Sequence, residues 1–463
     1  MEERVTIVGG GLAGSECALQ LARRGVAVTL VEQRPVASSP AHHTDRFGEL
    51  VCSNSLKATR PDSAAGLLKR ELEAMDCQLL NLAQSCSVPA GGALAVDRDQ
   101  FSSAVTAAIE SNPLITVERH EQTGLPSGRA VIAAGPLCSD ALYTTLADLV
   151  GGSHLSFFDA AAPIVEAESL DRGLVFEQSR YGEEGRGDYL NCPMDRDEYE
   201  AFHTALVEAE RVITRDFEQR ELFQACQPIE EIARKGVDAL RFGALKPVGL
   251  VDPRTERRPW AAVQLRAENA ERTAYNLVGF QTNLTWGAQA RVFRMIPGLE
   301  HAEFSRYGVM HRNSFVDAPR VLDHTFAIPG TTIRLAGQIT GTEGYVEAMA
   351  SGLLAAVNTY ADLEGLRPLE LPRTTALGSL VAYATNPETS PYQPMHVNFG
   401  IMVPLDGGRR GKRERYAAYA RRACADLADM LRERTDLFVR PDLSALVIDD
   451  ELAAIAREGR GRK

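Results

Sequence analysis

Two of the eight cysteines in this sequence stand where a thiol could react. Cys52 lies in the segment GELVCSNSLK, just ahead of a helical pattern that starts at Ala64, and Lys57 is close by. A helix N-terminus and a nearby cation both lower the pKa of a thiol, which favours the nucleophilic thiolate. Cys226 precedes a Gln-Pro pair, and a rigid turn is better suited to presenting a thiol than to burying it. The alternative for both cysteines is a small buried core residue, which most unpaired cysteines are.

The spacing of the cysteines excludes several kinds of site. The eight residues form no C-x-x-C pair and no cluster with histidine at metal-ligand spacing. Neither a zinc site nor a disulfide framework is therefore expected, and no bound metal is predicted. A C-x-x-x-x-C redox pair is also missing from the sequence, which argues against a disulfide reductase.

Three glycines near the start of the chain are spaced to bind a dinucleotide. Gly9, Gly11 and Gly14 follow the apolar run 5–8 and open an amphipathic segment in G-x-G-x-x-G spacing. The first glycine permits a tight turn, the second lets a pyrophosphate approach the backbone, and the third lets helix and sheet pack closely. Glu32 ends the next apolar run, where a carboxylate binds ribose hydroxyls and disfavours a 2′-phosphate. The pattern predicts FAD or NAD rather than NADP, and a βαβ unit with an incidental glycine turn is the alternative.

A second glycine-rich segment, IRLAGQITGTEGYVEAMASG, begins at Ile333. It predicts a strand that ends at Gly337, a tight turn with Gly341 and Gly344, and a helix from Tyr345. A helix N-terminus at this point would suit the edge of a flavin that becomes anionic on reduction. The two segments together predict a domain, discontinuous in sequence, that closes around one FAD.

The region between the two glycine segments has a different character. A buried strand spans residues 129–137 and would bring Gly135 to the cofactor, although a plain strand-to-turn glycine is the alternative. From Ser156 the alternation is that of antiparallel strands, followed by a charged amphipathic helical pattern. We therefore expect an α/β protein with a Rossmann-like FAD-binding domain of the glutathione-reductase type, interrupted by a smaller α+β insertion domain. The expected division is 1–155 and 296–463 for the FAD-binding domain and 156–295 for the insertion.

Aromatic, amide and basic side chains gather between residues 241 and 315. Side chains of these kinds line the sites of heterocyclic ligands, whereas scattered core aromatics and surface arginines are the alternative. The candidates are Lys246, Trp286, Arg291, Arg294, His311 and Asn313.

Composition limits the partners and the location. The net charge of −12 over 463 residues argues against indiscriminate binding of nucleic acid. A local basic cluster that opens a C-terminal helical pattern is a candidate contact for an RNA backbone, with a solvated helix face as the alternative. The cluster consists of Arg409, Arg410, Lys412, Arg413 and Arg415. Because no apolar run is long enough to span a bilayer and residue 1 leads straight into the first strand, we expect a cytoplasmic protein without a membrane partner.

Five segments in order resemble one family over nearly the whole sequence. They are CSNSLK around Cys52, QACQPIEE around Cys226, LKPVGL, the stretch from VFRMIPGL to GVMHRNSF, and GQITGTEGYVEAMASG. The chain is similar to the bacterial folate- and FAD-dependent tRNA (uracil-5-)-methyltransferases, the TrmFO family. Two departures are conservative in size: Ala244 where the family usually has proline, and Ser314 where it usually has threonine.

The resemblance implies an activity and its cofactors. Methylenetetrahydrofolate would supply a carbon unit to the uridine that opens the T-loop of tRNA, with FAD as cofactor and NADH or NADPH as reductant. Cys226 would be the thiol that attacks uracil and Cys52 a second functional thiol beside the flavin, with the two roles open to exchange. His311 and Asn313 would lie near the folate and the flavin ring. The other implied cofactor-binding residues are Gly9, Gly10, Gly11, Leu12, Ala13, Gly14, Glu32, Gly135, Gly337, Gln338, Gly341, Thr342, Glu343, Gly344 and Tyr345.

Three alternatives share parts of this pattern. The same chemistry could act on a uridine of 23S ribosomal RNA, because surface contacts decide the target. The related GidA flavoproteins, which modify wobble uridines, share the first and last segments and carry an additional helical domain beyond the length of this sequence. A flavoprotein that binds RNA without turnover is disfavoured by the two cysteines in polar, turn-rich settings.

Overall fold

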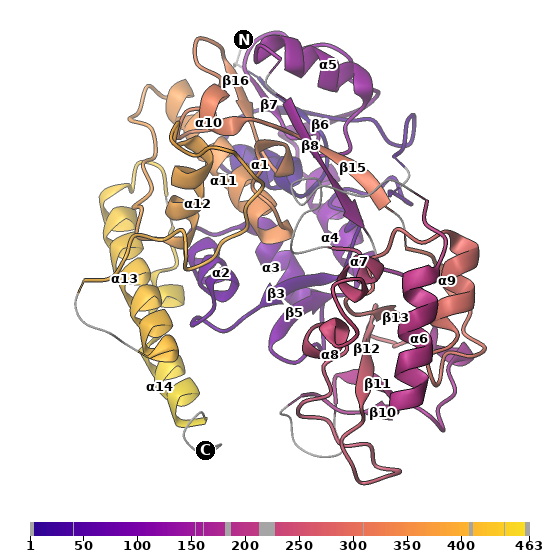
Figure 1. Ribbon diagram of the computed structural model, residues 1–463. Helices are drawn as coiled ribbons and strands as arrows, with labels where there is room; N and C mark the ends of the chain where they lie inside the picture. Colours follow the sequence, from indigo (N-terminus) through magenta and orange to yellow (C-terminus); the bar gives the residue numbers. More distant parts are fainter. Residues whose placement is uncertain are drawn as a thin grey trace.

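A five-stranded parallel sheet forms the centre of the larger of two lobes (Figure 1). The computed structural model describes residues 4–39, 41–152, 154–160, 162–180, 187–212, 227–308, 310–406, 411–438 and 440–458. The strand order is β16 (Ile333–Leu335), β7 (Ala130–Ile132), β1 (Val5–Val8), β2 (Val28–Glu32) and β6 (Ile115–Arg119). The central strands are rich in β-branched residues and are buried, as expected for a parallel sheet covered on both faces. β16 pairs with β7 although the whole smaller lobe lies between them in the sequence.

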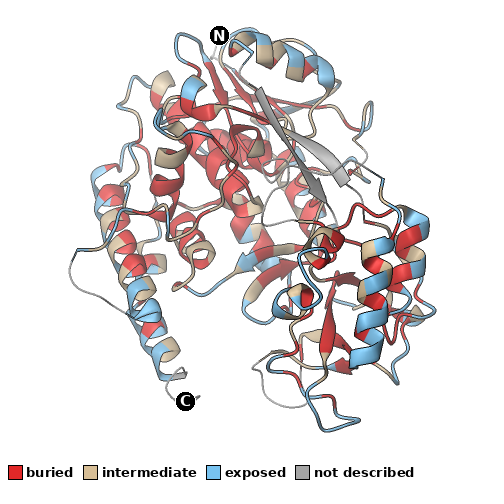
Figure 2. Cartoon of the chain, in the orientation of Figure 1, coloured by how far each residue is buried: buried red, intermediate tan, exposed pale blue. Residues whose placement is uncertain are grey.

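Helices and a small antiparallel sheet surround the parallel sheet and share one hydrophobic core with it (Figure 2). The small sheet has the order β3 (Ser55–Ala58), β5 (Ala93–Val96) and β4 (Ser87–Val88). The α-helices of this lobe are α1 (Leu12–Arg23), α2 (Ala64–Ala74), α3 (Gln78–Ser85), α4 (Arg98–Glu110), α5 (Asp140–Leu149), α10 (Ala318–Val321), α11 (Tyr345–Leu363), α12 (Ala376–Thr385), α13 (Lys412–Glu433) and α14 (Asp449–Glu458), with the 3₁₀ helices η4 (Gln338–Thr340) and η5 (Leu443–Leu446). A buried carboxylate fastens the start of α12 to this core, because Glu71 of α2 accepts the N–H groups of Ala376 and Leu377 at 2.6 and 2.9 Å.

The smaller lobe is built on a six-stranded antiparallel sheet with a hydrophobic core of its own. Its strand order is β10 (Phe176–Glu177), β11 (Tyr189–Met194), β12 (Ala261–Ala267), β13 (Ala274–Leu277), β9 (Ile164–Glu166) and β14 (Phe304–Arg306). Its helices are η1 (Ala167–Ser169), α6 (Arg196–Glu208), α7 (Ile229–Ala233), α8 (Ala239–Phe242) and α9 (Trp286–Phe293). α6 begins with a capping box in which Asp195 and Glu198 satisfy each other's backbone N–H groups.

A two-stranded antiparallel ribbon joins the lobes (Figure 1). It consists of β8 (His154–Ala160) and β15 (Met310–Val316), so the chain leaves the larger lobe on one strand and returns on the other. This topology confirms the predicted α/β fold with an antiparallel insertion. β14 belongs to the sheet of the smaller lobe although it lies after residue 295, and we therefore propose that the insertion runs from one strand of the ribbon to the other. None of the helices in the described ranges has the length and apolar character needed to cross a bilayer.

Adding a single methyl group at the contact of α1 with α11 is expected to destabilise the fold. A Cβ at Gly352 would collide with the backbone of Ala13, so Gly352→Ala must push the helices apart. We expect a loss of about 1–3 kcal/mol in unfolding free energy, more than the helix propensity of alanine restores. The matched control is Gly287→Ala in α9, where a Cβ meets nothing within 4 Å. Urea unfolding of both variants measures the difference, and equal stabilities would contradict this account of the contact.

Candidate active site

A cleft with about 960 Å³ of empty space, part of it open to solvent, lies at the carboxyl ends of the parallel strands. Open parallel sheets bind ligands at this edge. The predicted site residues that line the cleft are Gly9, Gly11, Leu12, Ala13, Glu32, Gly135, Gly337, Gln338 and Tyr345. The two glycine segments, which are far apart in the sequence, thus meet at one cavity.

The turn between β1 and α1 has room for an anion. Gly9 has φ +102°, and a Cβ there would lie 2.5 Å from the carbonyl oxygen of Ala133, so only glycine fits. At Gly11, the N-cap of α1, a Cβ would meet nothing within 4 Å, so its surroundings on that side are open. The first N–H groups of a helix have no partners within the helix and attract phosphate. The turn therefore fits the pyrophosphate of a dinucleotide.

A buried chain of charges holds the carboxylate of Glu32 at the cleft. One carboxylate oxygen accepts the N–H of Gly10 at 2.7 Å, and the other accepts Nε of Arg34 at 2.9 Å. Arg34 also donates to Glu49 at 3.0 Å, and its side chain is only 2% exposed. Burial by itself would raise the pKa of Glu32, but the hydrogen bonds and charge of Arg34 outweigh it and hold this pKa below its usual value. Glu32 therefore faces the cleft as a carboxylate that can accept hydrogen bonds from ribose hydroxyls.

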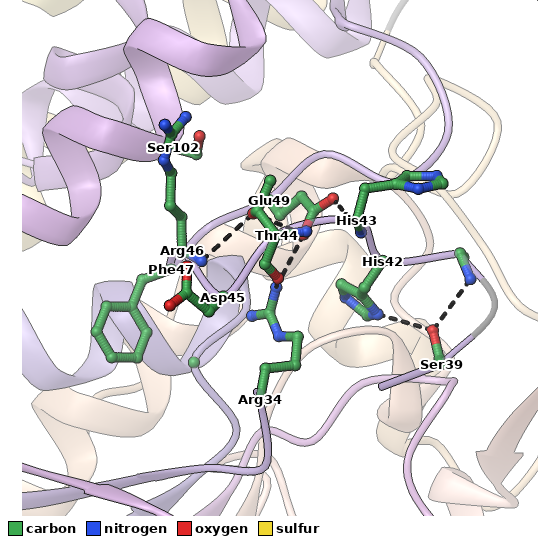
Figure 3. Close-up of polar contacts among 12 residues, drawn as sticks. Arg34, Ser39, His42, His43, Thr44, Asp45, Arg46, Phe47, Glu49 and Ser102 are labelled. Carbon is green, nitrogen blue, oxygen red and sulfur yellow. Dashed lines mark hydrogen bonds and ion pairs between the residues drawn. The ribbon is translucent and has the colours of Figure 1, made fainter. Parts of the chain in front are cut away.

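The loop after β2 supplies residues that the sequence did not reveal. Figure 3 shows the side chains of Arg34 and Thr44 and the backbone of His43 directed at Glu49. His42 lines the cleft, and its Nδ1 lies 2.7 Å from Oγ of Ser39. Burial, helped by the charge of Arg34, lowers the pKa of His42 to about 4, so its imidazole is neutral at pH 7. Because residues 35–43 show no periodicity, no sequence pattern marked His42.

The second glycine segment shapes the cleft indirectly. Gly341, Thr342, Glu343 and Gly344 are not among the residues that line the cavity. They form the turn that leads into α11, and Glu343 N–H donates to the carbonyl of Met395 at 2.9 Å. The side chain of Gln338 donates to that of Glu343, which ties the two ends of the turn together. This turn places Tyr345 at the start of α11, in the wall of the cleft.

Cys52 is half-buried in a loop that arginines from both lobes hold in place. Oη of Tyr345 accepts its N–H at 2.7 Å, and Arg98 of α4 donates to its carbonyl at 2.7 Å. Arg306 of β14 donates to the carbonyl of Val51 at 2.6 Å, and Arg266 of β12 donates to Asn54 at 2.8 Å. All three guanidinium groups are near enough to interact electrostatically with Cys52.

One expectation about Cys52 is wrong. α2 begins at Ala64 as predicted, but the strand β3, whose residues 55–58 pair with β5, lies between the loop and this helix, so Cys52 is not at a helix start. The cations beside this thiol therefore come from tertiary contacts. Burial also raises the pKa of Tyr345 far above its usual value, so its phenol is protonated beside the loop.

The remaining predicted residues lie elsewhere. Cys226, Arg409 and Arg410 are outside the described residues. His311 and Asn313 are on β15, opposite residues 159 and 157 of β8. Lys412, Arg413 and Arg415 begin α13, on the side of the larger lobe away from the smaller lobe (Figure 1). Gly10 and Gly14 belong to the β1–α1 turn and its helix, behind the cleft surface, and Lys246, Trp286, Arg291 and Arg294 are on the smaller lobe and do not line this cavity.

Known proteins resemble this chain in sequence and in fold. Residues 4–367 match the family model described as GIDA, glucose inhibited division protein A. The methylenetetrahydrofolate--tRNA-(uracil-5-)-methyltransferase TrmFO of Moorella thermoacetica is 52% identical over 425 residues, which cover 91% of this chain and 97% of that protein. The protein of the same name from Synechococcus sp. is 54% identical over 428 residues, covering 92% and 95% of the two chains.

A solved structure resembles this chain in its fold. GidA of Aquifex aeolicus superposes with a TM-score of 0.67 at 16% identity, covering 98% of this chain and 76% of that chain. GidA is thus a distant relative that shares the architecture, whereas the proteins named TrmFO match at about half of all positions. The resemblance deduced from the five segments is confirmed. The chain belongs to the TrmFO family of methyltransferases, within the wider GidA family.

Proposed function

We propose that this protein is a methylenetetrahydrofolate-dependent tRNA (uracil-5-)-methyltransferase that uses FAD and is reduced by NADH or NADPH. The observation that carries the proposal is the identity of 52% and 54% over more than nine-tenths of the chain to two proteins of that name. The cleft supports it, because its glycine turn and the Glu32 carboxylate fit a dinucleotide such as FAD. The distant relationship to GidA disfavours the modification of wobble uridines.

The residues of the cleft would divide the work of holding FAD. Gly9, Gly11 and the first turn of α1 would bind the pyrophosphate, and Glu32 would accept the ribose hydroxyls. Gly337, Gln338 and Tyr345 would flank the ring system. When bound, FAD would supply the hydride that reduces the transferred carbon unit from methylene to methyl.

The two thiols are proposed to serve different steps. The thiolate of Cys226 would form a bond to carbon 6 of uracil, which moves the electron pair of the ring double bond to carbon 5. Carbon 5 would then attack the methylene carbon of the folate while one of that carbon's two bonds to folate nitrogen breaks, and a base would remove the carbon 5 proton. The second carbon–nitrogen bond breaks so that tetrahydrofolate leaves, the methylene carbon receives the hydride that bound FAD would supply, and the sulfur–carbon bond breaks to restore the ring double bond and release the Cys226 thiolate. Cys52 would stand beside the flavin, in the loop that Tyr345 and Arg98 position.

A tracer experiment tests the proposal. Labelled carbon from methylenetetrahydrofolate should reach the T-loop uridine of unmodified tRNA when the FAD-loaded protein and NADH are present. NADPH in place of NADH decides which reductant is preferred. Label that arrives on unmodified 23S ribosomal RNA but not on tRNA would correct the target, and label on neither RNA would overturn the assignment of methyl transfer.

The basic start of α13 is proposed to contact the RNA backbone. Replacing Lys412, Arg413 and Arg415 together by glutamine is expected to weaken tRNA binding and to flatten its salt dependence by about 0.7–0.9 in log–log slope for each phosphate that the protein no longer neutralises. Filter binding over a range of salt concentrations measures the slope. The matched control is Arg432→Gln at the other end of the same helix, where the side chain is exposed and pairs with Asp429. A slope equal to that of the control would mean that the cluster is only a solvated helix face.

A further inference from the structure

Three aromatic rings of the smaller lobe form a stack that ends in solvent. The rings of Trp286 and Tyr307 have centroids 5.8 Å apart and an interplanar angle of 16°, and those of Tyr307 and Phe304 are 5.0 Å apart at 19°. Trp286 is the first residue of α9 and is 62% exposed, so the outermost ring of the stack faces water. A large apolar ring in this position leaves a face in water that a flat ligand would cover.

The buried side-chain amide of Gln289 fixes the rings of Trp286 and Tyr307 relative to each other. Gln289 of α9 donates to the carbonyls of Leu284 and Gly308 at 2.8 and 2.9 Å, and its own carbonyl accepts the N–H of Gly308 at 2.8 Å. These bonds hold the backbone next to Tyr307 against the helix that carries Trp286. The stack is therefore preorganised, which lowers the entropic cost of binding a ring against it.

Described residues near the stack contact the loop of Cys52 and the chain on both sides of the segment that carries Cys226. Val212 donates its N–H to the carbonyl of Asn283 at 2.8 Å, and Ile229 donates to Gln281 at 2.7 Å. Residues 213–226, among them Cys226, lie outside the described ranges, and the hydrogen bonds of Val212 and Ile229 hold the described chain on both sides of them next to the residues that precede Trp286. On its other side, Tyr307 follows Arg306, whose guanidinium holds the carbonyl next to Cys52.

Positive charge accompanies the rings. Arg291 of α9 and Arg294, the C-cap of that helix, are exposed, and the guanidinium of Arg294 lies 5.8 Å from the ring centroid of Phe304. Figure 2 shows exposed segments on the outer side of this helix. Arginines beside stacked aromatic rings are typical of surfaces that bind single-stranded nucleic acid, and here they stand out in a chain with a net charge of −12.

We propose that Trp286 is the outer ring of a platform on which an unpaired RNA base next to the modified uridine stacks. The inference rests on the proposed function, because it takes RNA as the substrate. A thiolate can reach carbon 6 only when the uridine has left its stack, which exposes a face of the neighbouring base. An RNA base fits better than the pterin of the folate because Trp286 is not among the residues that line the cofactor cleft.

Binding measurements on the FAD-loaded protein test the platform. Trp286→Leu should weaken the binding of an unmodified T-arm hairpin by about 5- to 150-fold, the effect of removing one base–aromatic stack, and Trp286→Tyr should recover much of it. The matched control is Trp260→Phe, which changes a tryptophan that packs against Arg241 at 3.6 Å. FAD content and the rate of flavin reduction by NADH, measured in parallel, detect damage to the fold or to the cofactor site.

Fluorescence identifies the ligand of the ring. The chain has two tryptophans, so Trp260→Phe leaves Trp286 as the single tryptophan emitter. The hairpin should quench this emission, and methylenetetrahydrofolate should not. Equal hairpin affinity of Trp286→Leu and the wild type, or quenching by the folate alone, would overturn the inference while the proposed function stands. A wild-type protein that binds no RNA would overturn both.

Discussion

Replacing Cys226 by alanine is expected to reduce carbon transfer to tRNA by about 10⁴-fold or more while the protein keeps its FAD. Carbon 5 of uracil is a poor nucleophile until sulfur has added to carbon 6, so loss of the attacking thiol removes the activation of the substrate. The tracer assay measures the rate, and the flavin absorbance of the purified variant measures the cofactor content. A variant that keeps a tenth or more of the activity would contradict the assignment of the attacking thiol.

A trapping experiment separates the roles of the two thiols. In RNA that contains 5-fluorouridine, fluorine replaces the carbon 5 proton that a base must remove, so the covalent adduct should accumulate with the wild type. Cys226→Ala should form no adduct that survives a denaturing gel. Cys52→Ala should still form it, because this thiol is assigned to the flavin side of the reaction. The reverse pattern would exchange the two roles.

The parts of the site that are formed by residues close together in the sequence could be predicted from the sequence. The G-x-G-x-x-G turn, Glu32 and the turn from Gly337 to Tyr345 are each set by short-range geometry, such as a positive φ or the end of a buried strand. Each pattern therefore marks its own place at the edge of the sheet. The antiparallel insertion was also visible, because its strands alternate with period two.

The parts that depend on long-range contacts could not be predicted. Arg98, Arg266 and Arg306 come from three elements in two lobes, and only the fold brings them to the loop of Cys52. A lone arginine in a strand or a helix has no sequence signature that distinguishes this role from surface exposure. The C-terminal end of the insertion could not be predicted for the same reason. β14 pairs with β9, and most of the smaller lobe lies between these two strands in the sequence.

Removing the cation between the buried Glu32 and the partly buried Glu49 is expected to have the largest effect on stability. Arg34→Met leaves Glu32 and Glu49 without the guanidinium that lies 2.9 and 3.0 Å from them, so two carboxylates must share a dry site. Breaking a buried ion pair from one side costs about 3–5 kcal/mol of unfolding free energy. The matched control is Arg46→Met on the same loop, whose partner Asp99 is 86% exposed and which should cost less than about 1 kcal/mol.

The pH dependence of this loss identifies its cause. In the wild type, Arg34 holds the pKa of Glu32 below the ordinary value of 4.5, so the stabilisation is complete above pH 4.5 and is lost as the pH falls through the lowered pKa. In Arg34→Met, burial acts without this opposing charge and raises the pKa of Glu32. Protonation of Glu32 therefore removes the buried negative charge that destabilises the variant as the pH falls from 7 towards 5. The difference in unfolding free energy between the two proteins should therefore shrink at pH 5. A difference that stays constant between pH 7 and pH 5 would show that poorer packing, rather than the unpaired carboxylates, destabilises the variant.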